Sequence, residues 1–107
     1  MNTDVRARQA TLFPPSIQEK FEKFHQENPD VYRLLVKLAR QVKASGRRHY
    51  GIGALFEQVR WHYAIERKGQ DGEFKLANDL RSRYSRLIMA QEPDLAGFFD
   101  TRQLRTQ

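Results

Sequence analysis

The segment from Asn78 to Ile88, NDLRSRYSRLI, combines arginine, asparagine and short hydroxyl side chains with a helical apolar stripe. At about 100° per residue, the stripe is formed by Leu80, Tyr84, Leu87 and Ile88. We expect the opposite face to carry Asn78, Ser82, Ser85 and Arg86, flanked by Arg81 and Arg83. Arginine can bind guanine through two hydrogen bonds, asparagine can bind adenine, and serine tolerates several bases. This pattern predicts a helix that approaches a polyanion closely.

A second basic cluster, GRRHY, precedes the third predicted helix. Arg47 and Arg48 could bind phosphate there, because the amides near Gly51 and Gly53 would add donors at a helix start. Between the third and fourth predicted helices, we assign Lys68 to phosphate and Lys75 to the base-reading face. A charged loop whose glycines serve only the turn is the alternative interpretation.

Residues that could support catalysis or hold a metal ion are scattered along the chain. His25, His49 and His62 fall in different predicted elements and form no i, i+4 pair, so they lack the usual spacing of metal ligands. The acidic residues of the second half are too dispersed for a metal-nuclease site, and no glycine loop of the phosphate-cradling kind is present. We therefore predict a protein that is not an enzyme and that has no metal ion or cofactor.

Trp61, in the segment VRWHY, has two readings. It could be a platform on which a base stacks. A position in the core beside Val59 is the better prediction, because a large aromatic next to a buried aliphatic residue is usually part of a core.

Length and composition predict one small globular domain. The chain has 107 residues, 39% of them hydrophobic and 11% aromatic, and no cysteine, which excludes disulfides. No apolar run reaches the roughly 20 residues of a membrane span, and MNTDVRARQATLF lacks the apolar centre of a secretory signal. We therefore expect a cytoplasmic protein of a bacterial host cell that does not bind membranes.

The net charge is +6, and its distribution favours an anionic partner. Residues 47–89 contain nine Lys and Arg residues against five Asp and Glu residues, and most of this excess is concentrated in GRRHY and RSRYSR. The basic segments lack a bulky apolar edge of the kind that inserts into a membrane. Nucleic acid, duplex DNA above all, is the predicted partner.

The predicted elements are four helices in one domain. We expect residues 1–15 to be a flexible arm ending in FPP, and residues 16–107 to be a single helical domain. Ser16 and Glu19 form a capping box for a helix to about Gln26. Asn28 is expected to cap a second helix that runs to about Ser45 and is terminated by Gly46. The third and fourth helices are expected at about 52–67 and 78–91. After Pro93, DLAGFFDTRQL could form a hairpin or a helical turn.

The fold class predicted from these elements is mainly α, with four to five helices. A basic helix that follows another helix, with a possible short hairpin at the carboxyl end, is typical of winged helix-turn-helix proteins. In that arrangement the second helix of the pair enters the major groove. The alternative is a four-helix bundle in which the same segment is an ordinary basic surface helix.

Four segments also resemble a family of small uncharacterised proteins of bacteriophages and prophages. They are NPDVYRLLVKLARQ, GIGALFEQVRWH, FKLANDLRSRYSRLIM and EPDLAGFFDTR, and the similarity covers about residues 20–105. Ala77 stands where the family's turn would carry an asparagine. The resemblance implies a phage-linked protein with a winged-helix-like core, and brings no activity or catalytic residues.

Together these observations predict a DNA-binding protein of phage or prophage origin. The alternative is a phage interaction protein that binds a host protein or a ribonucleoprotein complex, for instance to block a defence system. In that case the same arginines would pair with carboxylates or with RNA phosphates. Competition with duplex DNA would separate the two hypotheses.

Overall fold

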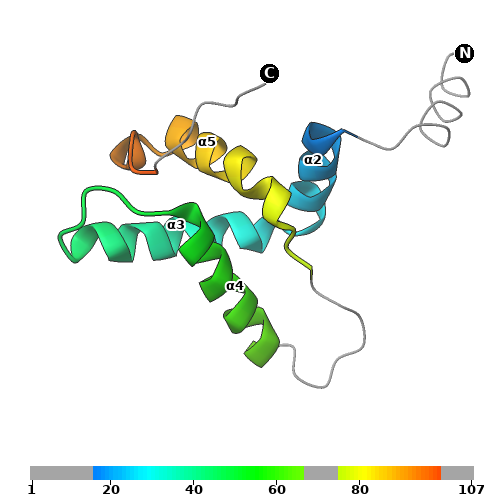
Figure 1. The fold of residues 1–107 in the computed structure, drawn as a ribbon, viewed down its shortest axis with the longest axis horizontal. Coiled ribbons are helices and arrows are strands. Elements are labelled where there is room, and N and C mark those ends of the chain that lie inside the picture. Colours follow the sequence, from blue (N-terminus) through cyan, green and yellow to red (C-terminus); the bar gives the residue numbers. More distant parts are fainter. Residues whose placement is uncertain (1–15, 67–74, 100–107) are drawn as a thin grey trace, which may run out of the picture.

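The computed structural model describes residues 16–66 and 75–99 of the chain (Figure 1). In this part the chain forms helices α2 (Ile17–Glu27), α3 (Pro29–Ala44), α4 (Ile52–Glu66) and α5 (Arg81–Gln91), with 3-10 turns η1 (Asn78–Leu80) and η2 (Pro93–Leu95). Helix accounts for 78% of the described residues, and none of them is in a strand. The prediction of a mainly α fold is confirmed. The expected flexible arm, residues 1–15, lies outside the described part.

Helix α2 begins where its capping box predicts. The Ser16 hydroxyl accepts a hydrogen bond from the Glu19 amide at 3.1 Å, and the Glu19 carboxylate accepts one from the Ser16 amide at 2.9 Å. Asn28 occupies the position before α3, but its side-chain amide donates to the Phe24 carbonyl of α2 and makes no cap for α3. The predicted boundary is therefore correct, while the predicted cap is wrong.

A short connection joins α3 to α4 and pairs with the carboxyl-terminal end of the described chain. Gly46 has φ of +107°, a conformation that L side chains rarely adopt, which explains the glycine at the end of α3. Further on, the Tyr50 amide donates to the Phe98 carbonyl at 3.1 Å, and Tyr50 and Phe99 form an isolated parallel bridge. The extended piece expected before α4 is thus present, as a single bridge.

The expected hairpin after Pro93 is not formed by residues 93–99. Residues Pro93–Leu95 instead make the turn η2, and both Phe98 and Phe99 are buried. In a strand these two side chains would point to opposite faces. Because the chain is irregular here, both rings reach the core, 5.3 Å apart between centroids. A wing within residues 93–99 is excluded, and the remainder of the predicted hairpin lies outside the described residues.

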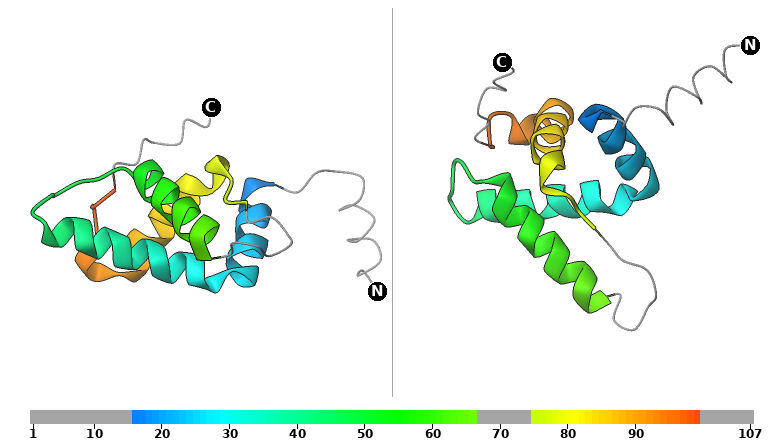
Figure 2. Two further views of the ribbon diagram at one scale, coloured as in Figure 1. Left: turned by 90° about the horizontal axis from the view of Figure 1, so that it is seen from below. Right: turned by 45° about the vertical axis from the view of Figure 1, so that its right-hand side comes forward.

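Helix α5 contributes the centre of the core. It packs against α3 and α4, while η1 packs against α2, and the views in Figures 1 and 2 show α2 across one end of α3. Tyr84 of α5 is fully buried, and its ring makes edge contacts with Phe21, Phe24 and Phe56. The other buried apolar residues are Val31, Leu35, Val36, Ala39, Leu55, Val59, Leu76, Leu80, Ile88, Leu95, Phe98 and Phe99.

The predicted core position of Trp61 is wrong. Its side chain is 66% exposed, whereas Val59 is fully buried. Two residues along a helix point about 200° apart, so the neighbour of a buried residue at i+2 faces solvent. Ile17, the first residue of α2, is also an exposed apolar residue, at 37%. None of the helices seen between residues 16 and 99 is both long and apolar enough to cross a membrane.

Candidate nucleic-acid interface

The outer face of α5 carries Ser82, Arg83 and Arg86. Arg86 is exposed, and Ser82 and Arg83 are half-buried. Residues three and four apart on a helix are surface neighbours, so Arg86 lies beside both of the others. An Arg83 guanidinium nitrogen lies 3.4 Å from the Ser82 hydroxyl, a long hydrogen bond that leaves most of its donors available. These three residues form a small, donor-rich surface, hereafter the α5 outer face.

Ser85 does not belong to the α5 outer face, and its predicted role is wrong. Its side chain is only 2% exposed, and its hydroxyl donates to the Ser82 carbonyl at 3.0 Å. Tyr84 and Ile88 are fully buried, and together with Ser85 they place the centre of the buried face closer to Ser85 than the apolar stripe indicates. A small hydroxyl that bonds its own helix backbone can be buried without an unpaired donor. Ser85 therefore cannot contact DNA bases.

Asn78 is exposed, but its side chain has a structural partner. Its carbonyl oxygen accepts a hydrogen bond from Arg60 of α4 at 2.6 Å, and it does not cap α5, which begins at Arg81. The same Arg60 nitrogen donates to the Leu76 carbonyl at 2.5 Å, and the other terminal nitrogen pairs with Glu57 at 2.5 Å. Arg60 therefore ties the chain before α5 to α4. The sequence gives no sign of this role, since its partners lie 16 and 18 positions away.

Arg81 is the first residue of α5, and its side chain packs against the first turn of α4. Its side chain covers Gly53, where an added Cβ would meet the guanidinium at 3.1 Å. Its Nε also donates to the Asn78 carbonyl at 3.1 Å. The glycine thus has a packing role that the loop prediction did not include, because it leaves room for an arginine from a neighbouring helix. Arg81 remains exposed, and neither of its terminal nitrogens makes a hydrogen bond among the described residues.

Arg47 and Arg48 lie in the loop between α3 and α4, and both are exposed. The Arg47 guanidinium sits over the Tyr50 ring, 5.6 Å from its centroid, a cation–π geometry. Together with Lys43, Gly46, Asp94, Ala96 and Phe98, the two arginines line a hollow of about 320 Å³. The hollow is not purely cationic, because Asp94 contributes a carboxylate to it.

The arginines of the described chain fall into two groups according to their partners. Arg33, Arg40 and Arg60 each pair with at least one carboxylate: Asp30, Glu92 with Asp94, and Glu57 respectively. Arg47, Arg48, Arg81, Arg83 and Arg86 pair with no carboxylate among residues 16–66 and 75–99. Every arginine of the second group was predicted to contact nucleic acid, and none of the first group was. Lys75 is exposed, and Lys68 lies outside the described residues.

The perturbed ionisable groups serve the fold. Burial raises the pKa of the Tyr84 phenol, whose oxygen is buried without a hydrogen-bond partner among the described residues. Burial also raises the pKa of Tyr32, helped by its 2.8 Å hydrogen bond to Glu92. Hydrogen bonding to Arg40 lowers the pKa of Asp94. Across the described ranges, no three His, Asp or Glu side chains are placed to hold a metal ion.

Sequence and structure comparisons supply no relative from which function could be transferred. No family model, curated protein or solved structure matches the chain. The resemblance to phage and prophage proteins therefore stays a prediction. The helix-turn-helix interpretation also stays a prediction: α4 and α5 do pack together, but residues 67–80 separate them, a longer connection than the three or four residues of a tight turn.

Proposed function

We propose that this protein binds nucleic acid, with duplex DNA as the first candidate, and that it does so without catalysis. The observation that carries the proposal is the second group of arginines, which have no carboxylate partner in the described chain. An arginine without an internal counter-ion is available to phosphate, to which its planar group can donate two hydrogen bonds at once.

The contacts proposed here are mainly to phosphate. Two of the side chains expected to read bases are not available for it, because Ser85 is buried and Asn78 accepts a hydrogen bond from Arg60. What remains on the α5 outer face is two arginines and one serine, and Arg47, Arg48 and Arg81 lie around the start of α4. Such a set positions a protein on a duplex but distinguishes sequences weakly. The protein is accordingly proposed to bind duplexes of different sequence with similar affinity and with a strong dependence on salt.

The test is a gel-shift titration of a short duplex at several salt concentrations. Arg86→Ala and Arg83→Ala should each weaken binding at low salt and reduce the slope of log K against log[salt] by about one, because each removes one phosphate contact. Ser82→Glu should weaken binding more than Ser82→Ala, since it adds a negative charge to the α5 outer face. Arg33→Ala is the matched control, because Arg33 pairs with Asp30 and should not contribute.

Two results would reject this proposal. If Arg86→Ala and Arg83→Ala stay folded and bind duplex with the parent's affinity and salt slope, the α5 outer face does not contact DNA. If single-stranded RNA binds at least as tightly as the duplex, with the same dependence on these arginines, RNA replaces DNA as the partner. Binding to a host protein or ribonucleoprotein, proposed as the alternative, would predict that duplex DNA fails to compete with that partner.

A further inference from the structure

A hollow opens between the carboxyl end of α3, the loop that follows it and the segment that contains η2 (Figure 1). Its volume, about 320 Å³, falls at the lower end of the range of small-molecule sites. Its cationic lining residues are Lys43, Arg47 and Arg48, and the buried ring of Phe98 lies behind them. Cations gathered around one concavity concentrate the field on a bound anion. We call this concavity the α3–η2 hollow.

The carboxylate of Asp94, which also lines the α3–η2 hollow, does not neutralise these cations. Arg40 of α3 donates to both of its oxygens, at 2.9 and 3.0 Å, so this carboxylate already has a counter-ion. Lys43 donates to the Asp94 backbone carbonyl and keeps two further N–H donors. In the described chain, Lys43, Arg47 and Arg48 pair with no carboxylate. The lining therefore keeps an excess of positive charge.

The carboxyl end of α3 lies beside the α3–η2 hollow, and its last carbonyls are already bonded. The Ser45 amide donates to the Gln41 and Val42 carbonyls at 3.2 and 3.1 Å, and the Gly46 amide donates to the Lys43 carbonyl at 3.0 Å. The Ser45 hydroxyl adds a bond to the Val42 carbonyl at 2.7 Å. A helix end carries about half a negative charge. This opposes an anion less strongly than the three full positive charges attract it.

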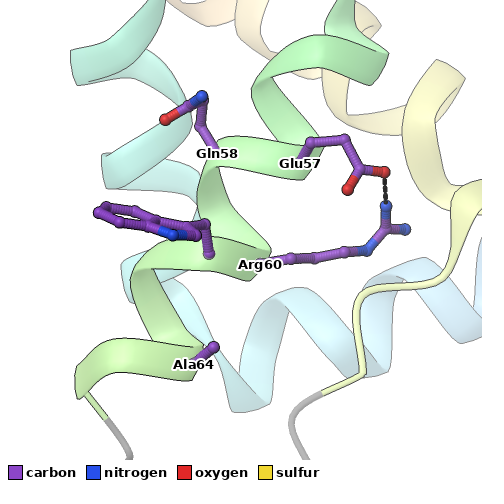
Figure 3. Close-up of a pocket in the computed structure, with 5 residues that line it drawn as sticks. Glu57, Gln58, Arg60 and Ala64 are labelled. Atoms are coloured by element: carbon purple, nitrogen blue, oxygen red, sulfur yellow. Dashed lines mark hydrogen bonds and ion pairs between the residues drawn. The ribbon is translucent and has the colours of Figure 1, made fainter.

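The larger hollow on α4, of about 660 Å³, has no comparable charge. Figure 3 shows Glu57 and Arg60, two of its lining residues, joined by an ion pair. The other terminal nitrogen of Arg60 donates to the Leu76 carbonyl and to Asn78. With both terminal nitrogens engaged, this arginine has no free one to offer an anion. The α3–η2 hollow is therefore the better anion site.

The cations of the α3–η2 hollow lead toward α5 along the loop before α4. Arg48 is five residues before Gly53, against which the Arg81 side chain packs. Five residues span at most about 18 Å. This length corresponds to about five nucleotide steps along one strand. One short stretch of nucleic acid is thus long enough to contact both the hollow and Arg81.

We propose that the α3–η2 hollow binds a phosphate monoester, the terminal phosphate at a nucleic-acid end. A monoester carries about −1.5 to −2 charge at pH 7 and three oxygens that accept hydrogen bonds, whereas a phosphate within a strand carries a single charge. Two arginines and one lysine match the larger charge. The loop and the η2 segment wall the hollow on two sides, so a chain end enters it more easily than a continuous strand. This inference rests on the nucleic-acid proposal for its choice of ligand, and adds a preference for ends.

The experiment compares two forms of one DNA hairpin with a single 5′ end, one bearing a 5′-phosphate and the other a 5′-hydroxyl. With the full chain, fluorescence anisotropy should show the phosphorylated form binding about tenfold more tightly, as expected for added charge-assisted hydrogen bonds. Excess AMP should reduce this affinity to that of the hydroxyl form, and adenosine should not. Arg48→Ala should bring the ratio of the two affinities close to one.

A second variant tests the α3–η2 hollow without removing an arginine. Ala96 is an exposed residue of its lining, so Ala96→Glu would place a carboxylate where the phosphate is expected. This variant should also lose the preference for the phosphorylated hairpin. Ala64→Glu is the matched control, an exposed alanine on α4 outside the hollow, and should keep the preference. Circular dichroism establishes that each variant is folded.

Equal binding of the two hairpins to the parent chain would overturn the inference, as would a preference that survives in folded Arg48→Ala or Ala96→Glu. If the hairpins bind equally but Arg83→Ala and Arg86→Ala weaken both, only end recognition fails and the nucleic-acid proposal stands. If AMP binds and neither hairpin does, the monoester is a free nucleotide and the nucleic-acid end is rejected. A phosphoserine peptide that binds more tightly than the phosphorylated hairpin would also reject it.

Discussion

Ser82 and Ser85 are one turn apart on α5 and differ in what their hydroxyls can do. The Ser85 hydroxyl donates to the Ser82 carbonyl and is enclosed by the core, whereas the Ser82 side chain is half-buried and contacts Arg83. Both residues are equally plausible contacts for DNA when only their types and spacing are considered. The difference arises from the position of the buried face, which tertiary packing fixes.

Replacing each serine by glutamate should lower the free energy of unfolding by very different amounts. Ser85→Glu would bury an unpaired carboxylate beside Tyr84 and should cost about 3 kcal/mol or more of unfolding free energy. Ser82→Glu can direct its carboxylate to solvent and should change stability by less than about 1 kcal/mol. Urea unfolding followed by circular dichroism measures both. Similar losses in the two variants would contradict the assignment of Ser85 to the core.

The exposed arginines of the candidate site could be predicted from the sequence, whereas the roles of Asn78 and Ser85 could not, and the difference has a physical reason. The exposure of Arg47, Arg48, Arg81 and Arg86 follows from residue type, because a long charged side chain is seldom buried without a partner. The roles of Asn78 and Ser85 depend on partners and packing that come from distant parts of the chain. Such contacts leave no periodic signal in the sequence. The contacts of Arg60 with Leu76 and Asn78 could not be predicted for the same reason.

At the scale of elements, α3 is tied to the end of α5 by a cluster of polar contacts. Arg40 of α3 donates to Glu92 at 2.7 Å and to the two carboxylate oxygens of Asp94 at 2.9 and 3.0 Å. Tyr32 donates to Glu92, and Lys43 donates to the Asp94 carbonyl. This cluster fixes the turn η2 against α3 and so positions the segment that leads to Phe98.

The Arg40 contacts make part of the stability dependent on pH. Arg40 lowers the pKa of Asp94 in the folded state, so the contribution of Asp94 is present above its ordinary unfolded pKa, near 4, and is lost as pH falls through the lower folded value. Arg40→Met should therefore unfold at a lower temperature than the parent at pH 6, and this gap should narrow as pH falls below about 4. Arg33→Met, which leaves Asp94 unaffected, is the control in the same thermal series. A gap that stays constant down to acid pH would show that Arg40 does not act through Asp94.

The helices themselves were largely predictable, and their ends show why. Ser16 and Glu19 form the predicted capping box, and Gly46 follows α3 with the positive φ that a glycine allows. These signals are local, so they can be read from a few consecutive residues. The start of α5 was misplaced by three residues because Asn78–Leu80 forms the turn η1, held by the distant Arg60.

At the scale of the whole molecule, the core is assembled from both ends of the described chain. Phe21 of α2 contacts Tyr84 of α5, and Phe98 and Phe99 close the opposite side beside Tyr50. The interior is rich in aromatic rings, which bury a large area per residue and help a small domain to form one core. Stability should accordingly depend on a few large buried side chains.

Two substitutions on α4 should show this dependence. Phe56→Ala removes a fully buried ring and should lower the free energy of unfolding by about 3–5 kcal/mol. Ile65→Ala, on the exposed side of the same helix, should change it by no more than about 0.5 kcal/mol. Denaturant unfolding of both variants is the measurement. A comparable loss in Ile65→Ala would mean that this side of α4 is covered in the folded protein.

The position of Trp61 also decides what its fluorescence can report. The sequence contains a single tryptophan, and its indole is largely in water in the folded chain. Its emission should therefore differ little between the folded and unfolded protein, so it would be a poor monitor of denaturation. A molecule that covers the ring would instead move the indole out of water and shift the emission to shorter wavelength. Trp61 fluorescence can therefore report, without an added label, any molecule that covers this side of α4, and the signal responds only weakly to folding.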